Sequence, residues 1–356
     1  MTKPGVNMEA VKEAVLPAIV ALLVAAIVGD LLILSFGQNP GTVYRLLLEG
    51  TWGNAYGLGQ VLYKATTLTF TGLAVAVGLR AGLFNIGAES QIAAGGFVAA
   101  LVGLVLPPGL PALLSLPVFL VAAAAGGGLV GGVPGVLKAK FGAHEVITTI
   151  MLNFIVLALL NYLTATHLKV PGSLHTAEIH GGALSRLSEF TEGFHGSAAN
   201  LVMLVAIAAA IITGWFLFRT RLGFELRATG LQPDAAEYGG IRVGSVWWRT
   251  LVLSGALAGI GGLNFVLGYK HYYEEAFASG TGFLGIAVAI VGRNHPLGVV
   301  LAALVFATIS QGGLAVNAVV PKQMVDVLQA VVIIAVAASV PEVRRILRNS
   351  VTRGAS

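Results

Sequence analysis

The stretch NLVMLVAIAAAIITGWFLF, residues 200–218, contains no charged side chain and runs directly into the polar segment RTRLGFELRATGLQPDAAEYGGIRVGSVWWR, residues 219–249. A helix rises about 1.5 Å per residue, so about 20 apolar residues cross the ~30 Å hydrocarbon core of a membrane. Because lipid cannot hydrogen-bond the backbone, such a stretch must be helical. The sequence therefore predicts a spanning helix that is followed by a loop in water.

The same pattern recurs along the whole chain. Of its 356 residues 56% are hydrophobic and 10% are charged, and the mean hydropathy is +0.86. Soluble domains carry about 25% charged residues, so this chain has too few charges to cover a surface in water. We predict an all-α integral membrane protein with about ten transmembrane helices, near residues 15–36, 65–79, 89–106, 114–136, 146–163, 200–218, 248–268, 281–292, 296–312 and 324–340.

The positive charges predict the orientation of these helices. With the N-terminus inside the cell, fifteen of the 21 lysines and arginines fall on inner segments, as the positive-inside rule requires. Both termini are then cytoplasmic, in a multi-pass protein of the cytoplasmic membrane. We expect tails at 1–14 and 341–356, a transmembrane domain at 15–340, an outer loop at 164–199 and an inner loop at 219–247.

Several classes of function are excluded by what the sequence lacks. It contains no cysteine, and although four histidines in the outer loop could bind a metal, their spacing is irregular, so we predict no metal site. The pI near 9.5 reflects loop charges that orient the helices in lipid and does not indicate nucleic-acid binding. The phosphate-binding motif G-x-x-x-x-G-K-[ST] is absent, and no catalytic constellation lies within the spans, so we expect neither an ATPase site nor catalytic residues.

The inner loop carries a predicted short helix. Pro233 can open it, Asp234 to Tyr238 continue it, and Gly239-Gly240 end it. An ordinary amphipathic connector would have the same local pattern, so periodicity alone leaves both interpretations open.

Three motifs resemble a known family. Arg227 to Ile241 is similar to the coupling loop of ABC importer permeases of the branched-chain amino acid, ribose and nucleoside group, with Gln232 where that family usually has Asn. Gly82 to Gln91 (GLFNIGAESQ) and His144 to Asn153 (HEVITTIMLN) resemble signatures of the nucleoside permeases that work with basic membrane lipoproteins. The resemblance covers residues from about 65 to 340 and fits the larger permease subunit of such systems.

The resemblance implies both partners and a docking element. ATP would be bound by a separate ATPase subunit, so no cofactor is expected in this chain. A second, related permease subunit and an extracytoplasmic substrate-binding lipoprotein would complete the importer, with lipid around it. The residues implied in ATPase coupling are Arg227, Gly230, Asp234, Ala235, Ala236, Tyr238, Gly239 and Gly240.

Polar residues at membrane depth are the candidates for the substrate route, since they are costly unless they face a cavity or another helix. Asn85 and Glu89 are spaced i, i+4 and are predicted to share a face with Gln91 nearby, while Thr149 and Asn153 have the same spacing on the fifth span. The alternatives are a polar helix cap for the first group and interhelical hydrogen bonds for the second.

The function these features predict is translocation of nucleosides by the permease subunit of an ABC importer. A permease for ribose or a related simple sugar is the alternative. An ion-coupled secondary transporter is the other competing class, and it would not need a coupling helix.

Overall fold

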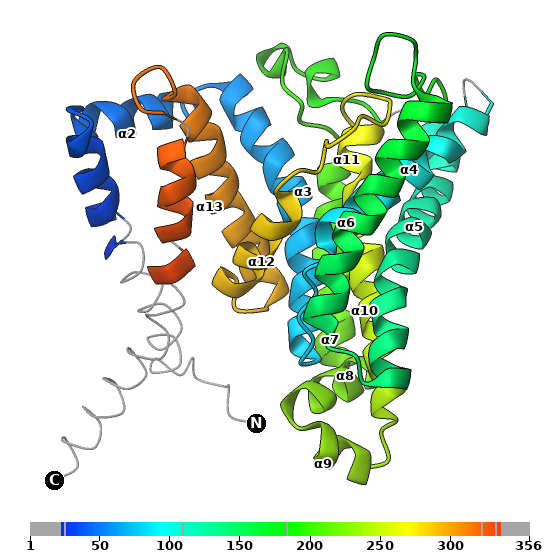
Figure 1. The fold of residues 1–356 in the computed structure, drawn as a ribbon. Helices are drawn as coiled ribbons and strands as arrows, with labels where there is room; N and C mark the ends of the chain where they lie inside the picture. The colour runs from blue at the N-terminus through cyan, green and yellow to red at the C-terminus, as the bar shows by residue number, and fades with distance from the viewer. Residues whose placement is uncertain are drawn as a thin grey trace, which may run out of the picture. The chain divides into compact units, whose positions relative to one another are not determined.

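The computed structural model describes residues 23–335, apart from 25, 108, 109, 183, 322 and 332, and apart from the side chain of Ala112. The predicted tails at 1–14 and 341–356, and the beginning of the first predicted span, lie outside the described residues. The helices numbered in Figure 1 are α2 (Pro40–Glu49), α3 (Ala55–Arg80), α4 (Ala88–Val105), α5 (Ala112–Phe141), α6 (Glu145–Leu163), α7 (Val202–Arg219), α8 (Arg221–Leu231), α9 (Pro233–Tyr238), α10 (Val243–Gly261), α11 (Leu263–Val266), α12 (Thr281–Val291) and α13 (Pro296–Ala315).

The described part of the chain is helical, and its extended pairing is limited to isolated bridges such as His175 with Glu274. Seven helices in this part are long and apolar enough to cross a membrane. They are Ala55–Arg80, Ala88–Val105, Leu113–Phe141, Glu145–Leu168, Val202–Arg219, Val243–Val266 and Pro296–Ala315. Shorter apolar helices occur at Ala26–Ser35, Thr281–Val291 and Gln323–Ala335, the last with residue 332 left aside. The prediction of a helical membrane protein is confirmed.

The chain forms two compact units. The larger comprises Asn54–Ala307, and the smaller combines the described residues up to Gly53 with the described residues from Thr308 onward. In the smaller unit Ile33 and Val43 pack with Val316 and Val320. The indole Nε1 of Trp52 also donates a hydrogen bond to Thr308 Oγ1 at 3.2 Å.

Glycines let the central helices of the larger unit touch through their backbones. A Cβ atom added at Gly127 of α5 would lie 2.7 Å from Cα of Gly259 in α10, and one at Gly259 would lie 3.0 Å from Cα of Gly127. Gly95 of α4 faces the same Gly259 backbone, and a Cβ at Gly262 would lie 2.7 Å from the Gly96 nitrogen. Small residues are what permit such close crossings in membranes, where burying apolar surface gives little driving force between helices. Helices α4, α5 and α10 are therefore packed with their main chains in contact.

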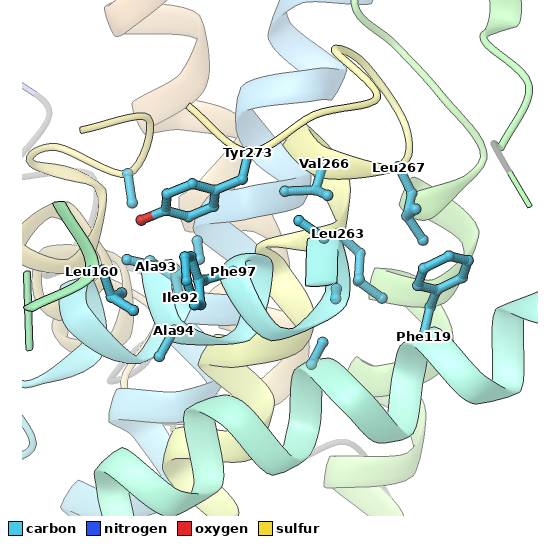
Figure 2. Packing of buried hydrophobic residues seen from close by; sticks show 14 of the residues in the cluster. Ile92, Ala93, Ala94, Phe97, Phe119, Leu160, Leu263, Val266, Leu267 and Tyr273 are labelled. Carbon is cyan, nitrogen blue, oxygen red and sulfur yellow. The ribbon is translucent and has the colours of Figure 1, made fainter. Parts of the chain in front are cut away.

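An apolar cluster continues this packing toward the end of α11. Figure 2 shows Phe97 of α4 beneath the ring of Tyr273, with Phe119 of α5 beside Leu267. Tyr273 is 1% exposed and meets Phe97 edge to face, with ring centroids 5.2 Å apart. The cluster fixes the non-helical stretch that carries Tyr273 onto the α4 and α5 pair.

One predicted span is too short. The span near 65–79 is part of α3, which begins at Ala55, where the Asn54 side chain caps the helix by accepting a hydrogen bond from Gly57 N at 2.6 Å. Gln60, Lys64 and the neighbouring threonines lowered the apparent hydropathy of its first half. Thr66 and Thr69 are buried in the bundle, whereas Gln60 and Lys64 are half-buried.

The glycine contacts predict a clear difference between adjacent positions on α5. Gly127→Ala should destabilise the fold by about 1–3 kcal/mol, because the new Cβ would overlap the α10 backbone. Gly128→Ala should be neutral or slightly stabilising, since its nearest neighbour would lie 3.4 Å away, an ordinary contact. Thermal unfolding of the purified protein in detergent would measure both, and equal melting temperatures for the two variants would contradict the packing account.

Candidate functional site

The segment that leads into α4 is not helical. After α3 ends, Gly82 adopts φ 73° and Leu83 N bonds back to Gly78 O at 2.9 Å, and α4 begins only at Ala88. Asn85 therefore precedes the helix, and the prediction that it shares a helical face with Glu89 is wrong. The physical reason is the pair of glycines, Gly82 and Gly87, which break the helical spacing on which the prediction depended.

Asn85 instead pairs with Gln91 inside the bundle. Asn85 Nδ2 donates to Gln91 Oε1 at 2.8 Å and to Ser254 Oγ at 2.8 Å, while Gln91 Nε2 donates to Asn85 Oδ1 at 3.1 Å. The Ser254 hydroxyl in turn donates a hydrogen bond to the carbonyl of Ala74 at 2.6 Å. Both amides are 0% exposed, so this network ties α3, α4 and α10 together at full burial.

The side chains of Thr149 and Asn153 on α6 form hydrogen bonds with the backbone at the start of α4. Ile86 N donates to Thr149 Oγ1 at 3.3 Å, and Ser90 N donates to Asn153 Oδ1 at 3.0 Å. Asn153 Nδ2 donates in turn to the carbonyl of Ile86 at 2.8 Å. The first N–H groups of any helix lack partners within it, and the residue before α4 is Gly87, which has no side chain to cap them. Asn153 of α6 therefore caps one of these groups, Ser90 N, and Thr149 and Asn153 also bind Ile86 just before the helix, as the interhelical alternative expected.

Glu89 differs from the other predicted route residues. It is 8% exposed, and its Oε2 has no hydrogen-bond partner among the described residues. The carboxyl accepts a hydrogen bond from the backbone of Gly280, just before α12 begins. A Cβ at Gly282 would lie 2.7 Å from the Cα of Glu89, so the first turns of α4 and α12 touch at this point. The positive ends of two helix dipoles therefore meet at one buried carboxyl group.

Sequence reasoning missed Ser254 and the ion pair of Glu145. Lys138 Nζ and Glu145 Oε2 are 2.7 Å apart, and the same ammonium lies 4.8 Å from the ring centroid of Trp247. The pair joins the end of α5 to the start of α6 and α10. The HE pair at 144–145 was visible in the sequence, but its partner depends on how three helix ends meet, which spacing does not reveal.

The inner loop folds largely as predicted. Pro233 opens α9, Tyr238 ends it, and Gly239 and Gly240 follow, the latter with φ 84°. The helix α8, preceding it, was not predicted. It begins after Thr220, whose hydroxyl accepts a hydrogen bond from Gly223 N at 3.1 Å. In Figure 1, α8 and α9 lie beyond the ends of α3, α5, α7 and α10.

The residues predicted for coupling divide into two groups. Asp234, Ala235, Tyr238, Gly239 and Gly240 are exposed, and the Tyr238 side chain is 96% exposed. Leu231 is 84% exposed beside them. A cleft of about 640 Å³ adjoins this surface between α8 and α9 and includes Ala235, Gln232 and Ile241 in its walls. An exposed apolar surface of this kind is typical of a protein contact.

The other group faces the protein's own interior. Ala236 is 6% exposed, and a Cβ at Gly230 would lie 2.8 Å from the main-chain carbons of Arg80 and Ala81. The guanidinium of Arg227 lies 5.4 Å from the ring centroid of Phe218. These residues position the exposed group instead of belonging to its surface.

Phe218, at the end of α7, connects α8 to two other helices. Its ring also lies 5.5 Å from the guanidinium of Arg80 on α3 and is stacked on His295, with centroids 5.4 Å apart. Arg80 Nε donates to the carbonyl of Asn294 at 2.9 Å, just after α12 ends. Arg227, Phe218 and Arg80 thus form a continuous stack from α8 to α3 and to the end of α12.

Spanning helices around a buried polar network, with an exposed short helix beyond their ends, define a multi-pass membrane transport subunit. The model of the family described as branched-chain amino acid transport system / permease component matches residues 57–337. The chain belongs to this family, which confirms that it is a transport subunit and not an enzyme.

Similar curated proteins are permeases of ABC transporters. The guanosine ABC transporter permease protein NupP of Bacillus subtilis (strain 168) is 37% identical over 90% of this chain and 92% of its own. The nucleoside ABC transporter permease protein NupB of Lactococcus lactis subsp. cremoris is 33% identical over 91% and 90%. The glucose ABC transporter permease protein TsgB13 of Haloferax volcanii is 33% identical over 89% and 85%. No solved structure matches the chain.

The network around α4 predicts a structural loss when Asn153 is truncated. Asn153→Ala leaves the Ser90 N–H and the Ile86 carbonyl without their partner, which costs about 1–3 kcal/mol. Thr148→Ala is the matched control, because the Thr148 hydroxyl bonds only to carbonyls of its own helix, His144 O and Glu145 O. A lower melting temperature for Asn153→Ala alone is expected; unchanged stability with altered substrate preference would instead assign Asn153 to the substrate route.

Proposed function

We propose that this chain is the nucleoside-translocating permease subunit of an ABC importer. The observation that carries the proposal is the identity of 37% and 33% to a guanosine and a nucleoside permease over about nine-tenths of the chain. The segment Gly82 to Gln91, whose resemblance to nucleoside permeases the sequence predicts, contains the buried Asn85–Gln91 pair and Glu89. The motif that resembles the subgroup therefore contributes to the polar interior of the bundle.

We further propose ten membrane crossings with both termini in the cytoplasm. The seven long helices and three shorter apolar helices coincide with the ten predicted segments, which supports this number. The distribution of lysine and arginine supports the orientation. In this arrangement α8 and α9 are cytoplasmic, and the residues between α6 and α7 are outside the cell.

The partners in this proposal are an ATPase subunit, a related second permease subunit and a substrate-binding lipoprotein. The exposed group on α9, with Ala235 and Tyr238, is the surface offered to the ATPase. Leu231 and Phe224, 59% exposed, enlarge its apolar area. Because Ala236 and Gly230 are packed inward, the contact rests on fewer residues than the motif contains.

We propose that Glu89 faces the substrate route. Its Oε2 is buried and has no hydrogen-bond partner in the part of the chain that the structure describes, and such an empty position in the bundle is satisfied by water or by a passing ligand. Ribose hydroxyls and base N–H groups are donors that suit a carboxylate. Asn85, Gln91, Thr149 and Asn153 have partners within the subunit, so in this proposal they hold the start of α4 beside the route.

Helix α12 links Glu89 to the surface proposed for the ATPase. α12 begins just after Gly280, whose backbone donates a hydrogen bond to the Glu89 carboxyl. The residues after its end, Asn294 and His295, contact Arg80 and Phe218. Phe218 also contacts Arg227 on α8. A displacement of α8 and α9 by the ATPase therefore has a contiguous packed path to the carboxylate.

A sugar importer is the second candidate, because the glucose permease of Haloferax volcanii is as similar in identity as the nucleoside permease, at 33%. Both substrate classes carry hydroxyl groups that can donate hydrogen bonds to the Glu89 carboxylate. They differ in the base, which only the nucleoside has.

Substrate class is tested by uptake in a strain without its own nucleoside transport. Cells that express the chain with its ATPase, partner permease and binding protein should take up labelled guanosine. Unlabelled nucleosides should compete, while glucose and ribose should not. Uptake should disappear when the phosphate-binding lysine of the ATPase is replaced. Uptake of glucose or ribose without guanosine would refute the nucleoside proposal, and guanosine uptake independent of the ATPase would refute the ABC mechanism.

The docking surface is tested by a bulky replacement on α9. Ala235→Trp should block close contact with the ATPase and reduce substrate-stimulated ATP hydrolysis and uptake at least about tenfold, as a disrupted protein contact does. Lys140→Trp is the control, since Lys140 is also exposed but lies at the end of α5. Full coupling in Ala235→Trp, measured in reconstituted vesicles, would show that α9 does not dock there.

A further inference from the structure

The chain between α11 and α12 is not helical, and it combines aromatic residues with strained backbone. α12 has 11 residues and is about 16 Å long, which is about half of the hydrocarbon core. The preceding residues 267–280 must cross the rest, and irregular backbone at that depth is tolerated only where protein covers it or a water-filled cavity adjoins it. His271 and Ala276 adopt φ 61° and 59°, a strained region for residues other than glycine.

Partly exposed aromatic rings line this stretch in a connected series. Phe265 is stacked on Phe277 with centroids 4.8 Å apart, and its ring lies 6.2 Å from that of Tyr269 and 6.5 Å from that of Tyr272. Tyr269 in turn lies 5.3 Å from Tyr63 of α3. The rings of this series on residues 265, 269, 272 and 277 are each only partly buried. Tyr273, in contrast, is buried and anchors the stretch in the core.

The outer loop fixes the backbone of this stretch. Thr176 N donates to Tyr273 O at 2.9 Å, and Ile179 N donates to His271 O at 2.7 Å. The guanidinium of Arg186, from the same loop, donates to the carbonyl of Tyr269 and lies 5.3 Å from its ring centroid. A surface held in this way needs little ordering when a ligand binds, which favours affinity.

We propose that Phe265, Tyr269, Tyr272 and Phe277 form a stacking platform for the base of the transported nucleoside; this rests on the proposed function. Every nucleobase has a π-face, and bases stack on aromatic side chains with little dependence on sequence. Lys270, whose ammonium lies 5.1 Å from the Tyr269 ring centroid, and Arg186 offer donors to the acceptor edge of a purine. The stretch ends at Gly280, which contacts the Glu89 carboxyl, so the platform leads to the proposed route residue.

The test compares loss of the ring with loss of the hydroxyl in the complete transporter. Tyr269→Leu and Tyr272→Leu should each lower guanosine uptake at subsaturating concentration about tenfold, because each removes a ring of the platform. For Tyr272 this concerns the face turned away from His175, since the two rings are stacked with centroids 4.2 Å apart. Tyr269→Phe and Tyr272→Phe should keep nearly normal uptake. Phe190→Leu is the control, an aromatic residue of the outer loop that is 68% exposed and separate from the series. Photolabelling with 8-azidoguanosine, followed by peptide mapping, should modify residues 265–277 in the wild type and not in the Leu variants.

Two results would overturn the platform while leaving the proposed function intact. One is guanosine uptake by the Leu variants equal to that of the wild type. The other is a loss of uptake shared by the Leu and Phe variants together with a lower melting temperature, which would make these residues structural. If the wild type transports a sugar and no guanosine, the proposed function fails first, and the base platform falls with it.

Discussion

Main-chain contact between α5 and α10 at glycines is the constraint on which the larger unit depends. Gly127 and Gly259 approach so closely that neither position has room for a side chain, and Gly95 brings α4 against the same point. Three helices held at this distance leave no space for mobile polar groups between them. The polar atoms that remain, those of Asn85, Gln91 and Ser254, are therefore paired with one another at full burial.

Two parts of the candidate site differ in their hydrogen bonding: the start of α4 is held by side chains of α6, whereas the Glu89 carboxyl can still bind a ligand. Asn153 of α6 caps the Ser90 N–H in the first turn of α4, and Thr149 and Asn153 hold the preceding Ile86 in place. Glu89, in the same turn, faces the start of α12, and one of its carboxyl oxygens has no hydrogen-bond partner within the described ranges. Because α12 touches Glu89 at one end and its following residues touch the Arg80–Phe218–Arg227 stack at the other, it connects the two regions for which a function is proposed.

What the sequence predicted correctly depends on local signals. Hydropathy located the apolar helices, and Pro233 with Gly239 bounded α9, because these residues act on their own backbone. The face that Asn85 would share with Glu89 was predicted wrongly, since Gly87 delays the helix. The inward side of α9, where Ala236 is buried and Ala235 is exposed, depends on how α8 packs, and identical residue types carry no signal for it. The partners of Glu145 and Asn153 come from distant segments and likewise left no pattern in the sequence.

The most direct test of this account is the replacement Glu89→Gln in the assembled transporter, measured as guanosine uptake together with the melting temperature. The amide retains the shape of the side chain but accepts hydrogen bonds less strongly than a carboxylate. The account predicts guanosine uptake lowered about tenfold at subsaturating concentration, with unchanged stability, because the lost interaction is with the substrate. Normal uptake at normal stability would contradict it, and so would a loss of uptake explained entirely by a collapse of the folded protein.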